Sequence, residues 1–286
     1  MSIDITKLTL PVVNTVSELM NLEESLAQPG AGGRKRMWAF RGQPREYQTL
    51  APSFQRLFAA ASHPAAELIE LDLISAFRQH YAMLPDRSAD MPDPSAIQGG
   101  FDLRCLSVMQ HYEVPTRLLD WTADFWTSIY FACASEPDGN AEVWVYDRNM
   151  FEFQIKPGAE FSSLLSSGSN LPQEPVLLGR RNDRLLVELD PRLTPRMRQQ
   201  HGHHTVSANV FQDHAQLLDE LQNNLPALPE EPWHFRRLTI DKSCKSKALR
   251  FLADHRKITA STLFPDVVGL GRFLRWHLDS LRTMLQ

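Results

Sequence analysis

The chain has little cysteine and no long apolar run. Its 286 residues include three cysteines, Cys105, Cys133 and Cys244, which lie far apart. An odd number at such spacings forms neither a disulfide framework nor a paired metal knuckle. We therefore expect three buried thiols and a reducing, cytoplasmic environment. No stretch of about 18 apolar residues is present, and residues 1–13 lack a basic start followed by an apolar core, so we expect neither a membrane span nor a secretion signal.

An excess of charge of one sign is also lacking. The 34 acidic and 30 basic residues give a net charge of −4, which argues against a strongly basic nucleic-acid binder but allows a local basic groove. A hydrophobic fraction of 43% and a charged fraction of 22% are typical of a folded protein. We expect one domain over residues 1–286, with a core of about 36–275 on which helices at 15–27 and 268–284 pack.

Several familiar catalytic motifs are absent. The sequence contains no Gly-rich phosphate loop ending in Lys-Ser/Thr, no GxSxG elbow and no HExxH. His201, His203 and His204 form an HGHH run with metal-ligating side chains, but no second ligand cluster lies nearby in the sequence. A histidine cluster in a surface turn is the commoner cause of such a run, so we expect no metal site.

Short helices and strands follow one another without a regular βαβ rhythm. The patterns predict helices at 16–26, 64–84, 95–111, 122–134, 212–222, 246–255 and 268–284. They predict strands at 37–40, 142–146, 184–189, within 200–208 and at 235–240. This mixture indicates an α+β fold with small mixed or antiparallel sheets and surrounding helices.

The segment Phe40-Arg41-Gly42-Gln43 is a first candidate for chemistry. An arginine at the end of a strand, beside a glycine that lets a ligand or backbone approach, suits bidentate phosphate binding. A structural ion pair of Arg41 is the alternative interpretation.

The segment from Gln110 to Thr122 (QHYEVPTRLLDWT) is a second candidate. Its polar side chains stand beside Tyr and Trp and are costly to bury unless they pair with one another. They suit either the floor of a pocket that stacks an aromatic ligand ring, or a polar network that locks the start of the next helix with Asp120 or Thr122 as its cap. A third segment, Arg196 to Thr205, is by itself consistent with a solvated basic turn.

Together these segments resemble the FRG domain family, which is named for its Phe-Arg-Gly motif. The family's block QHYGLPTRLLDWT is matched by Gln110 to Thr122 with Glu113 in place of Gly, and its YFA element by Tyr130-Phe131-Ala132. An Arg-x-x-x-Gln-x-Gly-x-Phe element is similar to Arg196, Gln200 and Gly202, with His204 in place of Phe. The family's LFPDLDGL is similar to part of Ser261 to Leu270.

The order of these elements is also similar to that of ADP-ribosyltransferases. This resemblance implies a fold of that type with NAD as substrate, Arg41 holding its diphosphate or ribose, and Asp120, Trp121 and Thr122 on a second strand. Gln200 falls where the third catalytic residue stands. Since Gln is neutral, Glu188 and Asp120 are the candidates for a carboxylate that stabilises the developing positive charge.

The resemblance thus implies a set of site residues. The catalytic ones are Arg41, Thr122, Gln200 and Glu188. The NAD-binding ones are Arg41, Gly42, Gln43, His111, Tyr112, Thr116, Arg117, Asp120, Trp121 and Tyr130.

The function that we expect is NAD-dependent mono-ADP-ribosyl transfer to a protein or nucleic acid, or NAD hydrolysis, in a bacterial toxin or antiphage effector. An inhibitory partner protein is compatible with such an activity. A non-catalytic nucleotide- or RNA-binding module is the alternative, because basic clusters recur along the chain. A third reading is an interaction domain whose final helix forms a dimer seam; the apolar stripe there is otherwise core, and it comprises Leu270, Phe273, Leu274, Leu278 and Leu281.

Overall fold

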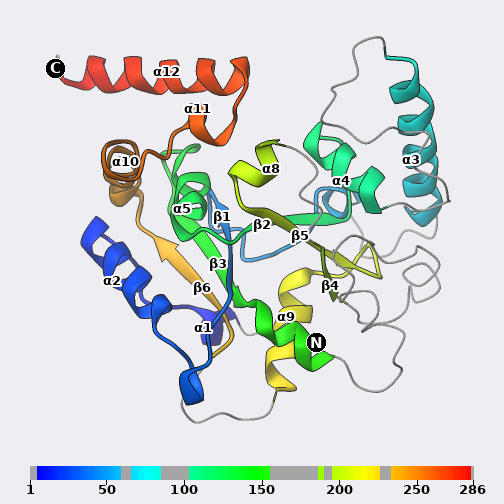
Figure 1. Cartoon of the computed structure of the whole chain (residues 1–286), viewed down its shortest axis with the longest axis horizontal. Helices are drawn as coiled ribbons and strands as arrows, with labels where there is room; N and C mark the ends of the chain where they lie inside the picture. The colour runs from blue at the N-terminus through cyan, green and yellow to red at the C-terminus, as the bar shows by residue number, and fades with distance from the viewer. Residues whose placement is uncertain are drawn as a thin grey trace.

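The computed structural model describes residues 5–58, 66–84, 103–154, 186–189, 195–225 and 233–284. Within these ranges one antiparallel sheet of six strands runs through the molecule in the order β4-β5-β2-β1-β3-β6 (Figure 1). The strands are β1 (Trp38–Gln43), β2 (Leu118–Thr122), β3 (Ala141–Asp147), β4 (Leu186–Leu189), β5 (Gly202–Ser207) and β6 (Phe235–Ile240). Together with the helices around it, this sheet confirms the predicted α+β class.

The helices in the described ranges differ widely in length. They are α1 (Ile5–Leu8), α2 (Val16–Ala27), α3 (Ala66–Ala82), α4 (Leu103–His111), α5 (Phe125–Cys133), α8 (Pro195–Gln199), α9 (His214–Asn223), α10 (Lys242–Phe251), α11 (Ala260–Leu263) and α12 (Val267–Met284). Short 3₁₀ segments lie at Ala31–Gly33, Gln55–Leu57 and Arg148–Gln154, and a π-helical turn at Leu252–Arg256. The helices predicted at 64–84 and 95–111 include residues 64–65 and 95–102, which lie outside the described residues.

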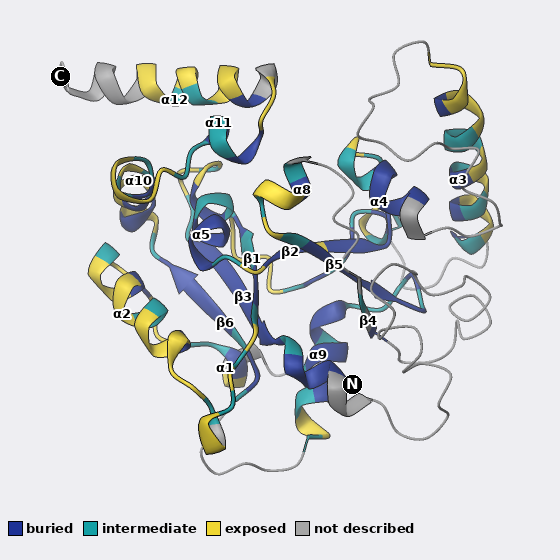
Figure 2. Ribbon diagram, in the orientation of Figure 1, coloured by how far each residue is buried: buried dark blue, intermediate teal, exposed yellow. Residues whose placement is uncertain are grey.

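The central strands are covered on both faces. In β3, Val143 and Val145 pack into one apolar cluster with α2, α5 and α10, while Trp144 and Tyr146 pack into another with α9. Strands covered on both sides read as continuous apolar runs, which is why EVWVY predicted this strand. Figure 2 shows the buried sheet between helices whose outer faces are exposed.

Helix α5 lies unusually close to β1. A Cβ atom on Gly42 would overlap the carbonyl O of Ser128 and the backbone N of Ala132, so only glycine allows this contact. The helix begins later than predicted. Thr122 ends β2, and Asp124 is the N-cap, accepting a hydrogen bond from the backbone N of Thr127 at 2.6 Å. The expectation that Asp120 or Thr122 caps this helix is therefore wrong.

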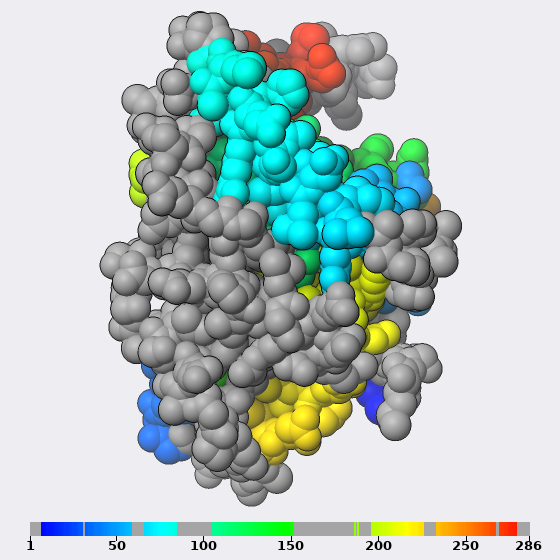
Figure 3. Space-filling model, turned by 90° about the vertical axis from the view of Figure 1, so that its right-hand side faces the viewer, coloured from blue at the N-terminus to red at the C-terminus, as the bar shows by residue number. Residues whose placement is uncertain are grey.

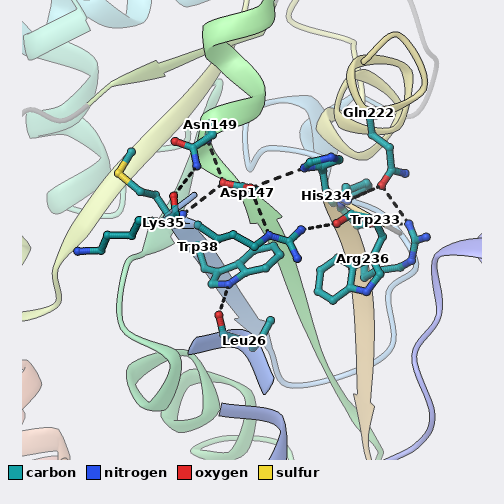
Figure 4. Close-up of polar contacts among 12 residues, drawn as sticks. Leu26, Lys35, Trp38, Asp147, Asn149, Gln222, Trp233, His234 and Arg236 are labelled. Atoms are coloured by element: carbon teal, nitrogen blue, oxygen red, sulfur yellow. Dashed lines mark hydrogen bonds and ion pairs between the residues drawn. The ribbon is translucent and has the colours of Figure 1, made fainter. Parts of the chain in front are cut away.

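A polar cluster lies at the end of β3, beside the start of β6 (Figure 4). Asp147 accepts a hydrogen bond from the backbone N of Asn149 at 3.1 Å, and Nδ1 of His234 lies 3.6 Å from its carboxylate. Burial raises the pKa of Asp147, but contacts with His234 and with backbone N–H groups outweigh this and lower it. Nearby, Trp38 donates from Nε1 to the carbonyl O of Leu26 at 2.7 Å, which fixes the end of α2.

Two peripheral helices differ in how they are held. Seen from the side, α3 lies across the upper part of one face (Figure 3), and Glu70 on it forms a buried ion pair with Arg117. Helix α12 lies along the top of the molecule (Figure 2) and leaves Leu270, Leu274 and Leu278 between 48% and 56% exposed. These leucines of the apolar stripe are thus not core residues.

No helix within the described ranges has the length and apolar character to cross a bilayer.

Candidate functional site

Strands β1 and β2 share fewer registered residue pairs than the other neighbouring strands of the sheet. Six residue pairs join β1 to β3, whereas Phe40 and Thr122 are the one registered pair that joins β1 to β2. Next to this pair the side chain of Arg41 also joins the two strands, because its Nη1 donates a hydrogen bond to the carbonyl O of Asp120 at 2.8 Å. The Nε of Arg41 is buried without a hydrogen-bond partner among the described residues. One donor of this guanidinium therefore has no protein acceptor among the described residues.

A cavity of about 250 Å³ opens at this point. Strands β1, β2 and β5 and helices α5 and α8 line it with thirteen residues: Phe40, Arg41, Gly42, Asp120, Trp121, Thr122, Phe131, Arg196, Met197, Gln200, Gly202, His203 and His204. The structure thus brings together six of the predicted site residues from three separate segments of the chain.

Asp120 and His204 lie against each other in the cavity. They are paired in register across β2 and β5, and Nδ1 of His204 lies 2.9 Å from Oδ1 of Asp120. Gln110 donates from Nε2 to Oδ2 at 3.0 Å. Partial removal from water raises the pKa of Asp120, but the contact with His204, with smaller effects of Arg41 and Gln110, lowers it to about 2. The group is therefore a carboxylate at neutral pH.

The two ring nitrogens of His204 differ in their surroundings. Neither has a hydrogen-bond partner with good geometry among the described residues, but Nδ1 lies against the Asp120 carboxylate, whereas Nε2 is buried with no charged group in contact; the side chain is 5% exposed. A buried polar atom without a partner is costly. A polar ligand in the cavity would remove this cost.

Thr122 and Gln200 both hold the loop between α8 and β5. Oγ1 of Thr122 donates to the carbonyl O of Gln200 at 2.7 Å and accepts from the backbone N of Asp124 at 3.0 Å. The amide of Gln200 donates from Nε2 to the carbonyl O of Leu263 at 3.0 Å. Gln200 therefore lines the cavity while its amide N–H is used to bind α11.

Other predicted site residues lie elsewhere. Glu188 accepts a hydrogen bond from Nε of Arg148 at 2.6 Å and does not line the cavity. Arg117 is 1% exposed and donates from Nε to Glu70 at 2.9 Å. Gln43 is buried and donates from Nε2 to the carbonyl O of Thr49. These contacts give the three side chains structural partners.

The remaining predicted residues are also outside the cavity. Thr116 is buried and donates to Oε1 of Gln110 at 2.6 Å, so it contacts Asp120 only through Gln110. His111 ends α4, and its neighbour Tyr112 is 46% exposed. Tyr130 lines a separate, larger cavity beneath α12.

Sequence reasoning missed His204 as a site residue. The HGHH run was expected in a surface turn, but His203 and His204 are 2% and 4% exposed in β5, and only His201 is exposed. The reason is that β5 is an inner strand, between β4 and β2. Within the described ranges, no group of three or more His, Cys, Asp or Glu side chains could hold a metal ion.

Comparison with known proteins gives a family for part of the chain. Neither the curated proteins nor the solved structures contain a match to it. The family model of the FRG domain matches residues 36–141, which include Arg41, Asp120 and Thr122 but not Gln200 or His204. Over residues 36–141 this chain is thus similar to the FRG domain family, in agreement with the Phe-Arg-Gly motif and the block before α5.

Proposed function

We propose that this protein cleaves the bond between nicotinamide and ribose in NAD and transfers ADP-ribose to a protein or nucleic acid, or to water. One observation carries the proposal: Arg41, Asp120, Thr122 and Gln200, which the resemblance to ADP-ribosyltransferases pointed to, line the same cavity.

The charges of the cavity suit this chemistry. Breaking the bond from C1′ of the ribose to the nicotinamide nitrogen leaves the electron pair on nicotinamide and builds positive charge on the ribose. A group that stabilises this charge more than it stabilises bound NAD accelerates the reaction. Asp120, ionised above a pKa of about 2, is the acidic side chain that lines the described cavity, and it takes the role considered for Glu188.

Two further residues assist in this proposal. Arg41 is a cation beside Asp120, and its unpartnered Nε is available to a phosphate or ribose oxygen. His204 is a positioning residue that fixes the orientation of the Asp120 carboxylate. An NAD-consuming activity fits a toxin or antiphage effector that acts in the cytoplasm, and we extend the proposal to that role.

The decisive experiment measures nicotinamide released from NAD by the purified chain. We expect release by the wild type and a loss of roughly 100- to 1,000-fold in Asp120→Asn, the range found when one electrostatic stabiliser is removed. Asp138→Asn is the matched control, because Asp138 is an exposed carboxylate in a turn away from the cavity. Equal release by the wild type and Asp120→Asn would contradict the role of Asp120, and no release at all would contradict the activity.

A second candidate, a non-catalytic nucleotide-binding module, is favoured by one contact. The amide of Gln200, at the expected third catalytic position, is bound to Leu263. Calorimetry with NAD and ADP-ribose separates the two functions, since a binding module holds both ligands without releasing nicotinamide.

A further inference from the structure

A larger cavity lies beneath α12, between this helix and α5, α10 and α11. Its volume is about 860 Å³, and its walls contain Arg272 and Arg275 but no acidic residue. Five aromatic side chains line it: Tyr130, Phe131, Phe264, Phe273 and Trp276. Aromatic rings combined with arginine form the usual platform for a nucleobase and its phosphate.

This cavity and the site around Asp120 are neighbours. Phe131 lines both of them. Two guanidinium groups contact the ring of Phe264: Arg196 of the smaller cavity is 4.4 Å from its centre, and Arg272 of the larger cavity is 4.9 Å from it. Neither arginine forms an ion pair with any residue that the structure describes.

Two cations, Arg196 and Arg272, lie at the boundary between the cavities. Burial is the main cause that lowers the pKa of Arg196; Asp120 raises it, Arg272 lowers it by less, and Glu113 and Asp266 also raise it. Arg196 and Arg272 repel each other, and an anion bound between their guanidinium groups would relieve this repulsion. A diphosphate supplies that anion.

The volumes of the two cavities also support a ligand that occupies both. Sites for small molecules usually measure about 300–1,000 Å³. At about 250 Å³, the smaller cavity is too small for a dinucleotide such as NAD, whereas the larger one, at about 860 Å³, falls within this range. A ligand of two nucleosides joined by a diphosphate that places one ribose beside Asp120 would therefore extend into the larger cavity.

We propose that the cavity beneath α12 binds the adenosine half of NAD, with the diphosphate between Arg196 and Arg272 and the nicotinamide ribose beside Asp120. The identity of the whole ligand rests on the function proposed above. The stacking of the adenine ring and the contact of Arg272 with phosphate are separate claims that AMP alone tests.

The test is calorimetry of the full chain with AMP, NAD and nicotinamide mononucleotide. Loss of a base–aromatic stack weakens binding by about 5- to 100-fold, so we expect Trp276→Ala to lose this much affinity for AMP and NAD. Trp276→Phe keeps an aromatic ring and should restore most of it. Binding of nicotinamide mononucleotide should change less than twofold in both variants.

Arg272→Ala is the second variant, because Arg272 lines the cavity and is exposed on the surface of α12. It should weaken AMP and NAD, whereas Arg250→Ala, an exposed arginine on α10 outside the cavity, should not. Failure of AMP to bind the wild type, or unchanged AMP binding in Trp276→Ala and Arg272→Ala, overturns the inference. If AMP binding depends on these residues but no nicotinamide is released, the subsite stands and the proposed reaction falls.

Discussion

His204 on β5 lies opposite Asp120 on β2, with its Nδ1 2.9 Å from the carboxylate and its Nε2 buried without a partner among the described residues. This contact joins two neighbouring strands within the cavity.

Replacing His204 should change the pH dependence of NAD cleavage. Without its main stabilising contact the pKa of Asp120 rises from about 2, so the carboxylate is protonated at a higher pH. Since a hydrogen bond to a charged group is worth roughly 1.5–3 kcal/mol, the acid limb of activity in His204→Phe should move upward by about one to two pH units. Arg41 and Gln110 still face Asp120 in this variant.

The measurement is the pH profile of nicotinamide release from pH 3 to 8. His201→Asn serves as the control, since His201 is exposed at a positive φ of 49° that asparagine tolerates. A variant with lower activity but the same acid limb would show that His204 does not act through Asp120.

Gly42→Ala should destabilise the fold. The new methyl group overlaps the backbone of α5 at Ser128 and Ala132, and overpacking of this kind costs about 1–3 kcal/mol or more. Gly271→Ala is the matched control, because its Cβ meets nothing within 4 Å and alanine favours a helix by about 1 kcal/mol. Thermal melts of both variants should therefore shift in opposite directions, and a Gly42→Ala melt at the wild-type temperature would refute the close contact.

Arg117 should matter for stability and not for NAD. Arg117 and Glu70 are each 1% exposed, and removing one partner of a buried ion pair costs roughly 3–5 kcal/mol. Arg117→Met should therefore lower the urea midpoint strongly, while the double variant with Glu70→Met should recover much of the loss. Calorimetry on the folded double variant should give wild-type NAD affinity. A large loss of affinity would show that Arg117 takes part in binding NAD.

Stability should fall as the solution becomes acidic. Burial, with smaller effects of Arg41 and Arg117, lowers the pKa of His214 from 6.5 to about 3. Below pH 6.5 the unfolded chain binds a proton at His214, whereas the folded chain does not bind it until about pH 3. Stability is therefore lost progressively as the pH falls between these two values. His203 is buried with a lowered pKa and acts in the same direction.

Urea unfolding at pH 7 and pH 4.5 checks this prediction. His214→Asn, which keeps a hydrogen-bonding side chain beside Oγ1 of Thr205, should have a smaller difference between the two urea midpoints than the wild type. An equal difference in both proteins would show that His214 does not cause the loss.

The sequence predicted local elements well where one pattern dominates. The strand predicted at 235–240 has the bounds of β6, and the helix predicted at 16–26 is α2, Val16–Ala27. It failed at Thr122, because an apolar run shared by the end of a buried strand and the start of a buried helix has no single period. Asp124, the true cap, lies inside that run.

The site was predictable in part. The motif residues Arg41, Asp120 and Thr122 could be found because they stand in recognisable segments. The burial of His204 depends on which strands flank β5, and the placement of Arg196 beside Phe264 depends on the packing of α8 against α11. Both are tertiary relationships that spacing along the chain does not contain.

The segment before α2 lies along the outer strand of the sheet. The backbone N of Leu10 donates to the carbonyl O of Arg237, and that of Val13 donates to the carbonyl O of Thr239. An open edge strand is a template for aggregation, and this segment covers part of the open edge of β6. Removal of residues 1–13 would therefore expose backbone hydrogen-bonding groups of β6. Such a fragment should form oligomers through strand exchange even if its core stays folded.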